Sequence, residues 1–178
     1  LLNRMIAPDN SDDLRVECMK ALEVLGNLES CQAMARFIVS GDSVKRPAQK
    51  SLKRLCLNYG DPDLLWNSVF VPALNTAAND AIRADLLVIA DAVAGDDLLA
   101  YIQKKIFDTG SPLRSTALKT LQRWPNMEAS EVWLELISMP NVSASDIKAA
   151  QSGLGRMVKS KEVEGWEKLE LPSNGESA

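Results

Sequence analysis

The 178-residue chain contains no histidine. This absence excludes Ser-His and Cys-His catalysis, histidine-ligated metal sites and imidazole pH switches. The three cysteines form no CxxC pair, which favours small buried residues in helices over a disulfide or a metal site. Glycine-rich phosphate loops and the GxSxG nucleophile motif are also missing from the sequence. We therefore assign no catalytic, cofactor-binding or metal-binding residue and expect a protein that is not an enzyme.

Long apolar runs are missing as well. No stretch approaches the roughly 20 apolar residues of a transmembrane helix, so we expect no membrane span. The first residues, Leu1 to Arg4, lack the basic lead-in and cleavage site of a signal peptide, and they lack an initiator methionine. We therefore expect the chain to be a fragment of a longer protein, and its compartment stays open.

Acidic residues outnumber basic ones by 24 to 20, which gives a net charge of −4. A nucleic-acid partner is therefore not expected, because such proteins usually carry a basic excess. One basic cluster lies in a stretch that has no acidic residue and is predicted to share a helix face: Arg46, Lys50, Lys53 and Arg54. The cluster has two interpretations. It is either an anchor for a polyanion or an acidic partner, or a solvated convex face near acidic neighbours such as Asp61 and Asp63.

A short pattern recurs five times: Asp or Ser, any residue, then Leu, Val or Ile, then Arg or Lys. The copies are 30, 38, 31 and 34 residues apart and begin at Asp12, Asp42, Asp80, Ser111 and Ser145. Apolar residues follow the aliphatic position at steps of four, four and three, which places them on one face of an α-helix. The opening Asp or Ser is predicted to be the N-cap of that helix. The fifth copy is degraded, as is typical of a terminal repeat.

A second set of helices is predicted between these, over residues 29–40, 61–75, 96–108 and 127–138. Gly41, Gly60, Gly95 and Gly110 are expected to end helices in the left-handed conformation. Strand signals are nearly absent, so the predicted fold class is all-α, built from about five helical hairpins. The hairpins are expected near residues 11–41, 42–76, 79–109, 111–139 and 144–168, with 1–10 as the remnant of an upstream repeat and 169–178 as a disordered tail.

These features resemble the HEAT-type helical repeat family. The segment Asp80-Ala81-Ile82-Arg83 and the helix after it are similar to that family's second-half pattern, as is Asp12 to Gly26. The stretch from Leu113 to Asn126 resembles HEAT segments of large bacterial multidomain proteins. The resemblance implies a right-handed α-α superhelix, an armadillo-like solenoid in which each hairpin stacks on its neighbours. It also implies a polar ladder in which each motif Arg or Lys contacts an acidic residue of a neighbouring repeat.

HEAT arrays are mostly binding scaffolds, so the resemblance implies a non-enzymatic scaffold that binds a protein partner on the concave surface of the second helices. The candidate contact residues are Gln32, Arg36, Trp66, Asn67, Lys104 and Glu131, and packing of Trp66 in the core is the competing interpretation. Two alternatives stay open: a HEAT-like DNA glycosylase or other nucleic-acid-binding enzyme, and a purely structural spacer. The acidic net charge and a basic cluster on the convex layer argue against the glycosylase.

Overall fold

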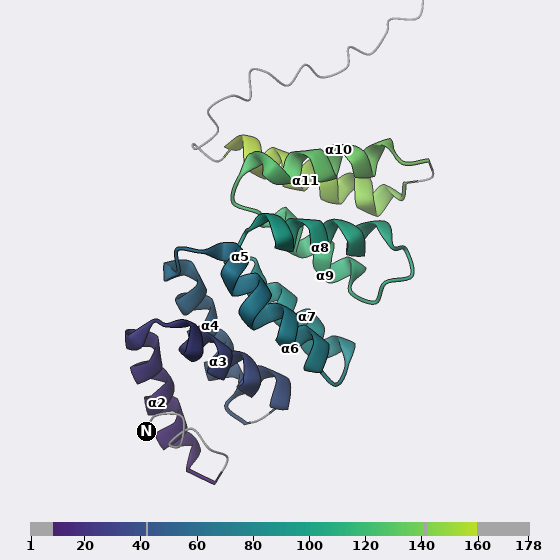
Figure 1. Ribbon diagram of the computed structural model, residues 1–178. Coiled ribbons are helices and arrows are strands. Elements are labelled where there is room, and N and C mark those ends of the chain that lie inside the picture. The colour runs from purple at the N-terminus through teal and green to yellow at the C-terminus, as the bar shows by residue number, and fades with distance from the viewer. Residues whose placement is uncertain (1–8, 42, 141, 160–178) are drawn as a thin grey trace, which may run out of the picture. The chain divides into compact units, whose positions relative to one another are not determined.

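The computed structural model describes residues 9–41, 43–140 and 142–159 (Figure 1). Within these ranges every regular element is helical and no strand occurs, so the predicted all-α class is confirmed for the described chain. Most of the expected upstream remnant, the end of the fifth hairpin and the expected tail lie outside the described residues. The elements are α2 (Asp12–Leu25), α3 (Leu28–Ser40), α4 (Lys45–Asn58), α5 (Pro62–Leu65), the π-helical turn η1 (Trp66–Phe70), α6 (Val71–Thr76), α7 (Asp80–Ala90), α8 (Asp96–Phe107), α9 (Arg114–Gln122), the 3₁₀ turn η2 (Met127–Ala129), α10 (Ser130–Ser138) and α11 (Ala144–Lys159).

None of the helices in these three ranges combines the length and the apolar character that crossing a membrane requires.

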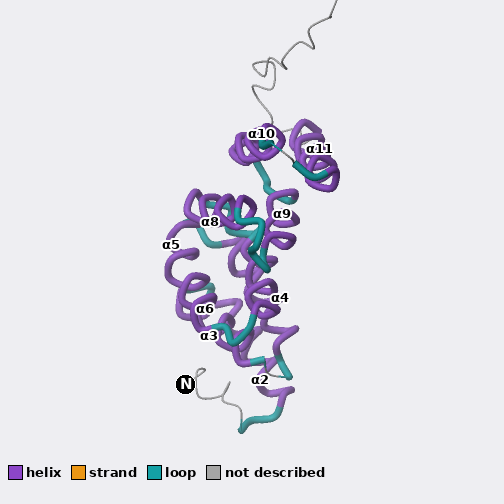
Figure 2. The backbone as a smooth tube through the Cα atoms, turned by 90° about the vertical axis from the view of Figure 1, so that its right-hand side faces the viewer, coloured by secondary structure: helices purple, strands orange, loops and turns teal. Residues whose placement is uncertain are grey.

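The chain divides into two compact units, one ending at Arg123 and the other beginning at Trp124. In the first unit, the helices that the recurring motif opens contact one another in order: α2 packs on α4, α4 on α7 and α7 on α9. We call these four the motif helices. The others, called the intervening helices, form a second row in which α3 contacts η1 and α6, while α5 and η1 contact α8. Figure 2 shows α4 and α9 on one side of this unit and α5, α6 and α8 on the other.

The recurring motif predicts how many residues separate successive helix pairs. It does not predict whether a motif helix pairs with the helix before it or with the helix after it. The sequence pattern pairs each motif helix with the helix that comes after it, as in residues 11–41. In the structure the most extensive contacts join an intervening helix to the motif helix after it, α3 to α4 and α8 to α9. In the second unit they join α10 to α11, the helix that carries the fifth copy of the motif. The predicted hairpin over 111–139 is divided, because α9 belongs to the first unit and α10 to the second. The spacing between copies is the same whichever helix is counted first in a pair. Spacing alone therefore could not place the boundaries between the helix pairs.

At α2 and α7 the N-cap lies one residue earlier than the motif predicts, whereas at α4 and α9 it lies two residues later, at Val44 and Leu113. At α7 the side chain of Asn79 accepts a first-turn N–H at 3.0 Å, whereas Asp80 is already helical and pairs with Arg83 at 2.8 Å. Ser11 and Asp12 take the same two positions at α2. A carboxylate in the first turn still stabilises the helix through its dipole, so the Asp favours the helix without being its N-cap.

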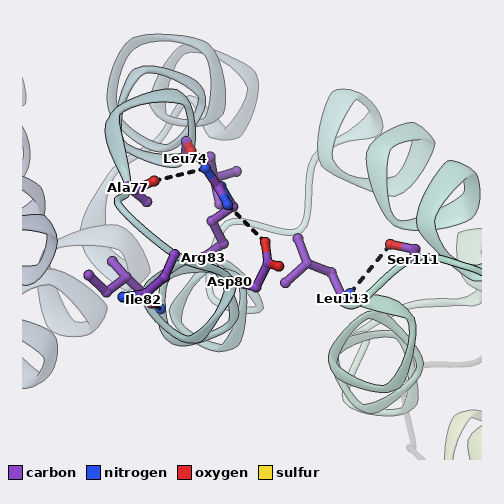
Figure 3. Close-up of polar contacts among 8 residues, drawn as sticks. Leu74, Ala77, Asp80, Ile82, Arg83, Ser111 and Leu113 are labelled. Carbon is purple, nitrogen blue, oxygen red and sulfur yellow. Dashed lines mark hydrogen bonds and ion pairs between the residues drawn. The ribbon is translucent and has the colours of Figure 1, made fainter.

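The arginine of the motif binds the end of the preceding helix (Figure 3). Arg83 Nε donates to the carbonyl of Leu74 at 3.2 Å and Arg83 Nη2 donates to that of Ala77 at 2.8 Å. Arg114 Nε donates in the same way to the carbonyl of Ile106, at 2.8 Å, near the end of α8. Carbonyls in the last turn of a helix have no partner within that helix. Arg83 and Arg114 therefore cap the intervening helices that precede them.

The motif lysine of α4 forms a contact of the predicted ladder, and other residues also connect neighbouring motif helices through ion pairs. Lys45 Nζ of α4 lies 2.5 Å from Asp85 Oδ2 of α7. Asp91, whose side chain is 6% exposed, binds Lys53 of α4 at 2.8 Å and Arg123 at 3.1 Å. A carboxylate shared by two cations in this way fixes the end of α7 between the helices on either side of it.

Apolar residues of the motif helices form the core of the first unit. The stripe predicted from the sequence is buried along α4, α7 and α9, through Ala48, Leu52, Leu55, Leu86, Ala90, Ala117 and Leu121. The matching residue at the end of α2, Leu25, is 57% exposed, and Gln151 of the degraded fifth copy is also exposed. The stripe is therefore a reliable guide to burial where a motif helix has a neighbour on each side, and it is wrong at Leu25.

One of the four predicted left-handed glycines is confirmed. Gly41 has a φ of 70°, whereas Gly60, Gly95 and Gly110 have no positive φ. Ala94 takes a positive φ of 47° instead, and Gly95 directly precedes α8. A Cβ at Gly95 would overlap the carboxylate of Asp63, so this glycine permits close approach of α5 and α8.

In the second unit, α10 packs along α11. Trp133 of α10 is fully buried, and its indole faces Gly153 of α11. A Cβ at Gly153 would lie 2.6 Å from the Trp133 ring, closer than two carbon atoms can approach. The pair therefore sets the distance between the two helices.

Candidate functional site

A groove of about 410 Å³ runs between α3 and the segment formed by η1 and α6. We call it the α3 groove. Its walls are mostly apolar, and its lining residues are Gln32, Ala35, Arg36, Val39 and Ser40 of α3 with Ser68, Val69, Pro72, Ala73 and Thr76 opposite. It lies on the row of intervening helices, the surface on which the sequence predicts partner contacts.

The shape of the far wall results from a proline inside a helix. Pro72 has no N–H, so it cannot bind the carbonyl of Ser68, and its ring crowds that carbonyl. The chain widens here into a π-helical turn, in which the N–H of Val71 binds the carbonyl of Trp66 five residues back. Gln32 Nε2, from α3, donates to the Ser68 carbonyl at 3.2 Å. The amide thus binds the carbonyl that lacks an N–H donor at Pro72, and it links the two walls.

Arg36 is the ionisable residue of the α3 groove. It lies one helical turn after Gln32 and is exposed. Among the described residues it has no hydrogen-bond or ion-pair partner. An arginine above an apolar floor offers several N–H donors and a planar face to a ligand. The groove can therefore hold an apolar group and a negatively charged group side by side.

The prediction that Trp66 faces outward is wrong. Its side chain is only 3% exposed, and its ring lies 6.0 Å from that of Phe70 and 5.1 Å from that of Tyr101. The π-helical turn begins at Trp66 and directs the indole toward α8. Burial of so large an apolar surface stabilises the contact between η1 and α8, so Trp66 is a core residue.

The remaining candidates do not line the α3 groove. Asn67 is exposed, and its Nδ2 donates to Asp97 of α8 at 2.6 Å, which makes it a link between neighbouring intervening helices. Lys104 is exposed on α8 and is not among the lining residues of the α3 groove. Glu131 is exposed on α10, in the second unit. Of the candidate contact residues, only Gln32 and Arg36 line the groove.

The basic cluster of α4 divides into two pairs. Lys53 binds Asp91, and Arg54 lies 3.3 Å from Glu23 of α2. The acidic partners are therefore on neighbouring motif helices and not at Asp61 or Asp63. Among the described residues, neither Arg46 nor Lys50 has a hydrogen-bond or ion-pair partner.

The buried thiols are poorly suited to nucleophilic chemistry. Burial raises the pKa of Cys31 to about 11. Burial, together with the nearby Cys31 and Asp91, raises the pKa of Cys56 to about 12. At neutral pH both side chains are therefore protonated, and the thiolate is the nucleophilic form. No group of three or more His, Cys, Asp or Glu side chains that could hold a metal ion is found in the described part of the chain.

A second cavity, of about 400 Å³, was not predicted from the sequence. It is lined in part by Asp80, Arg83, Tyr101 and Lys105. Burial raises the pKa of Tyr101, and Lys105 Nζ lies 5.3 Å from the centre of its ring. Arg83 is already bound to two carbonyls and to Asp80. Its N–H donors are therefore less available to a ligand in this cavity than the list of lining residues suggests.

The chain is 26% identical over 121 residues to the serine/threonine-protein kinase ssn3 of Aspergillus niger. The aligned stretch covers 67% of this chain and 27% of the kinase, so the chain spans little more than a quarter of that relative's length. No family model and no solved structure matches the chain. A similarity of this extent carries no activity over to this protein.

Proposed function

We propose that this chain is a HEAT-type helical-repeat scaffold that binds a protein partner in the α3 groove. The recurring motif and the ordered contacts within each row support a stacked array in which every helix pair completes the core of the next. The observation that carries the proposal is the combination of an apolar groove with an exposed arginine that has no partner among the described residues. Interfaces are enriched in such arginines, which supply much of the binding energy.

The chemistry of the groove defines the kind of segment that it binds. The apolar walls fit an aliphatic or aromatic side chain, and Arg36 fits a carboxylate beside it. Gln32 contributes less, because its amide already donates to the carbonyl of Ser68. The partner is therefore a protein segment in which an acidic residue lies next to an apolar one.

Site-specific photocrosslinking tests this function. A photoreactive amino acid replaces Ser40 in the groove wall or, as a control, the exposed Ala21 on α2. In a lysate of the source cells, we expect a defined crosslinked protein from position 40 and none of the same mass from position 21. We expect Arg36→Glu to abolish the crosslink. Lys119→Glu makes the same change in charge at an exposed position of α9 and should preserve it.

The outcomes separate the proposal from its alternatives. A crosslink that survives Arg36→Glu would show that the α3 groove does not hold the partner. The absence of any crosslink specific to position 40 would favour the spacer. Crosslinks to nucleic acid from position 40 would favour the nucleic-acid-binding alternative.

A further inference from the structure

A second groove, of about 480 Å³, lies between α4 and α7 on the row of motif helices. We call it the α4 groove. Its lining includes Lys50, Lys53 and Arg54 together with the apolar residues Leu57, Val88 and Ile89. It belongs to the opposite row from the α3 groove, so binding at the α4 groove does not depend on the proposed function.

The acidic residues near this groove are already matched by cations. Asp85 is paired with Lys45, and Asp91 is shared by Lys53 and Arg123. On the other side of α4, Glu23 accepts from Ser51 and pairs with Arg54. These ion pairs neutralise the carboxylates that face α4 from both neighbouring helices.

Two cations are left over. Lys50 and Arg46 are exposed and have no partner among the residues that the structure describes. Lys50 lines both the α4 groove and a smaller groove of about 250 Å³ between α2 and α4, where Arg46 also lies. Positive charge that no carboxylate balances therefore extends along the outer face of α4.

Apolar side chains are exposed next to these charges. Leu57 is 65% exposed and Val88 is 37% exposed. Leu57 and Val88 line the same groove together with Ile89, so they form one continuous apolar surface beside Lys50. Apolar surface rimmed by charge is typical of an interaction site.

We propose that the α4 groove binds an extended acidic segment of a partner protein that also carries an apolar side chain. The apolar side chain packs between Leu57 and Val88, and carboxylates pair with Lys50 and Arg46. The apolar floor favours a protein segment over a nucleic acid, whose phosphates would use only the cations.

Helix geometry gives the spacing of the segment. Leu57 lies seven residues beyond Lys50, or about 10 Å along α4, and Arg46 lies about 6 Å on the other side of Lys50. An extended chain advances about 3.4 Å per residue. Side chains of an extended chain alternate between its two faces, so the three contacting residues must be separated by even numbers of positions. The matching segment therefore has two acidic residues two positions apart, and the apolar residue comes four positions later, or the same order is reversed.

An NMR titration with a synthetic peptide tests this proposal. The probe is an extended peptide of about 10 residues with two glutamates and one leucine at this spacing. We expect backbone amide shifts in α4 and in the part of α7 that lines the groove. We expect Lys50→Glu to weaken binding about tenfold or more, because it replaces an attraction by a repulsion. Binding should also weaken as salt is raised.

Matched controls define the result. Lys119→Glu carries the same charge change and should bind like the wild type, and a peptide with glutamine for glutamate or serine for leucine should bind more weakly. Because Lys50 is exposed and unpaired among the described residues, Lys50→Glu should unfold at the wild-type temperature, which separates lost binding from lost folding.

Four outcomes would overturn the proposal. The first is that the peptide shifts no backbone amide of α4. The second is that Lys50→Glu and Lys119→Glu weaken binding equally. The third is that the peptide with glutamine for glutamate binds as tightly as the acidic peptide. The fourth is stronger perturbation of the same residues by phosphatidylglycerol vesicles or by duplex DNA, which would make the α4 groove a membrane or nucleic-acid site.

Discussion

The two rows of helices in the first unit are connected by different kinds of interaction. Motif helices are joined by ion pairs, such as Lys45 with Asp85 and Asp91 with both Lys53 and Arg123. Intervening helices are joined by amide side chains and by aromatic packing, as Gln32 binds the carbonyl of Ser68 and Trp66 packs on Tyr101.

The difference shows how a charged cluster in a sequence should be interpreted. Lys53 and Arg54 connect neighbouring helices, whereas Arg46 and Lys50 on the same helix face do not. Lys53 and Arg54 are therefore paired with acidic neighbours, and the anchor interpretation stays a prediction for Arg46 and Lys50. On the intervening row the same distinction separates Asn67, which bridges to Asp97, from Arg36, which lines a groove.

The largest effect is expected from Trp66→Ala on the intervening row. The change removes a buried ring that packs on Phe70 and Tyr101, and it leaves a cavity. We expect the free energy of unfolding to fall by about 4 kcal/mol, measured by urea denaturation. Leu57→Ala on α4 is the control, because its exposed side chain should lose well under 1 kcal/mol. Equal losses in the two variants would show that Trp66 is not part of the core.

A smaller effect is expected from Asp91→Ala on the motif row. The variant leaves Lys53 and Arg123 without their shared carboxylate, and we expect a loss of about 2 kcal/mol in the free energy of unfolding. Because both cations are partly exposed, salt should screen the interaction, and the loss should shrink in 1 M salt, where the Debye length is about 3 Å. The exposed Asp13→Ala is the control. A salt-independent loss would mean that packing, and not charge, connects this row.

The smallest effect is expected from Gln32→Ala, at about 1 kcal/mol. The variant removes the donor to the Ser68 carbonyl. A double-mutant cycle with Pro72→Ala sharpens this prediction. Alanine at position 72 restores a backbone N–H that can bind Ser68 within the helix, so loss of the glutamine amide should then cost less. Additive losses in thermal or urea unfolding would show that the amide does not compensate for the proline.

The sequence predicts the helices well because apolar periodicity and turn residues mark them. The expected helices over 29–40 and 96–108 agree within a residue with α3 and α8. The phase of the helix pairs could not be predicted, since the motif repeats with the same period from any starting point. At α7 the N-cap was displaced because Asp80 and its neighbour Asn79 are both good capping residues.

The candidate site was less predictable. Arg36 and Gln32 could be placed on the intervening row from helical spacing alone. The burial of Trp66 depends on Tyr101, which lies 35 residues further along the chain. The pairing of Arg54 with Glu23 and of Lys53 with Asp91 likewise depends on contacts between helices that are distant in sequence.

The π-helical turn over Trp66–Phe70 also affects where the sequence can gain or lose residues during evolution. The copies of the motif on either side of it are the two that lie 38 residues apart, the longest of the spacings. A π-helical turn accommodates an additional residue while the helix before it and the helix after it keep their buried faces. Insertions and deletions of one residue should therefore have accumulated in this segment during evolution, and not in regular helices such as α3.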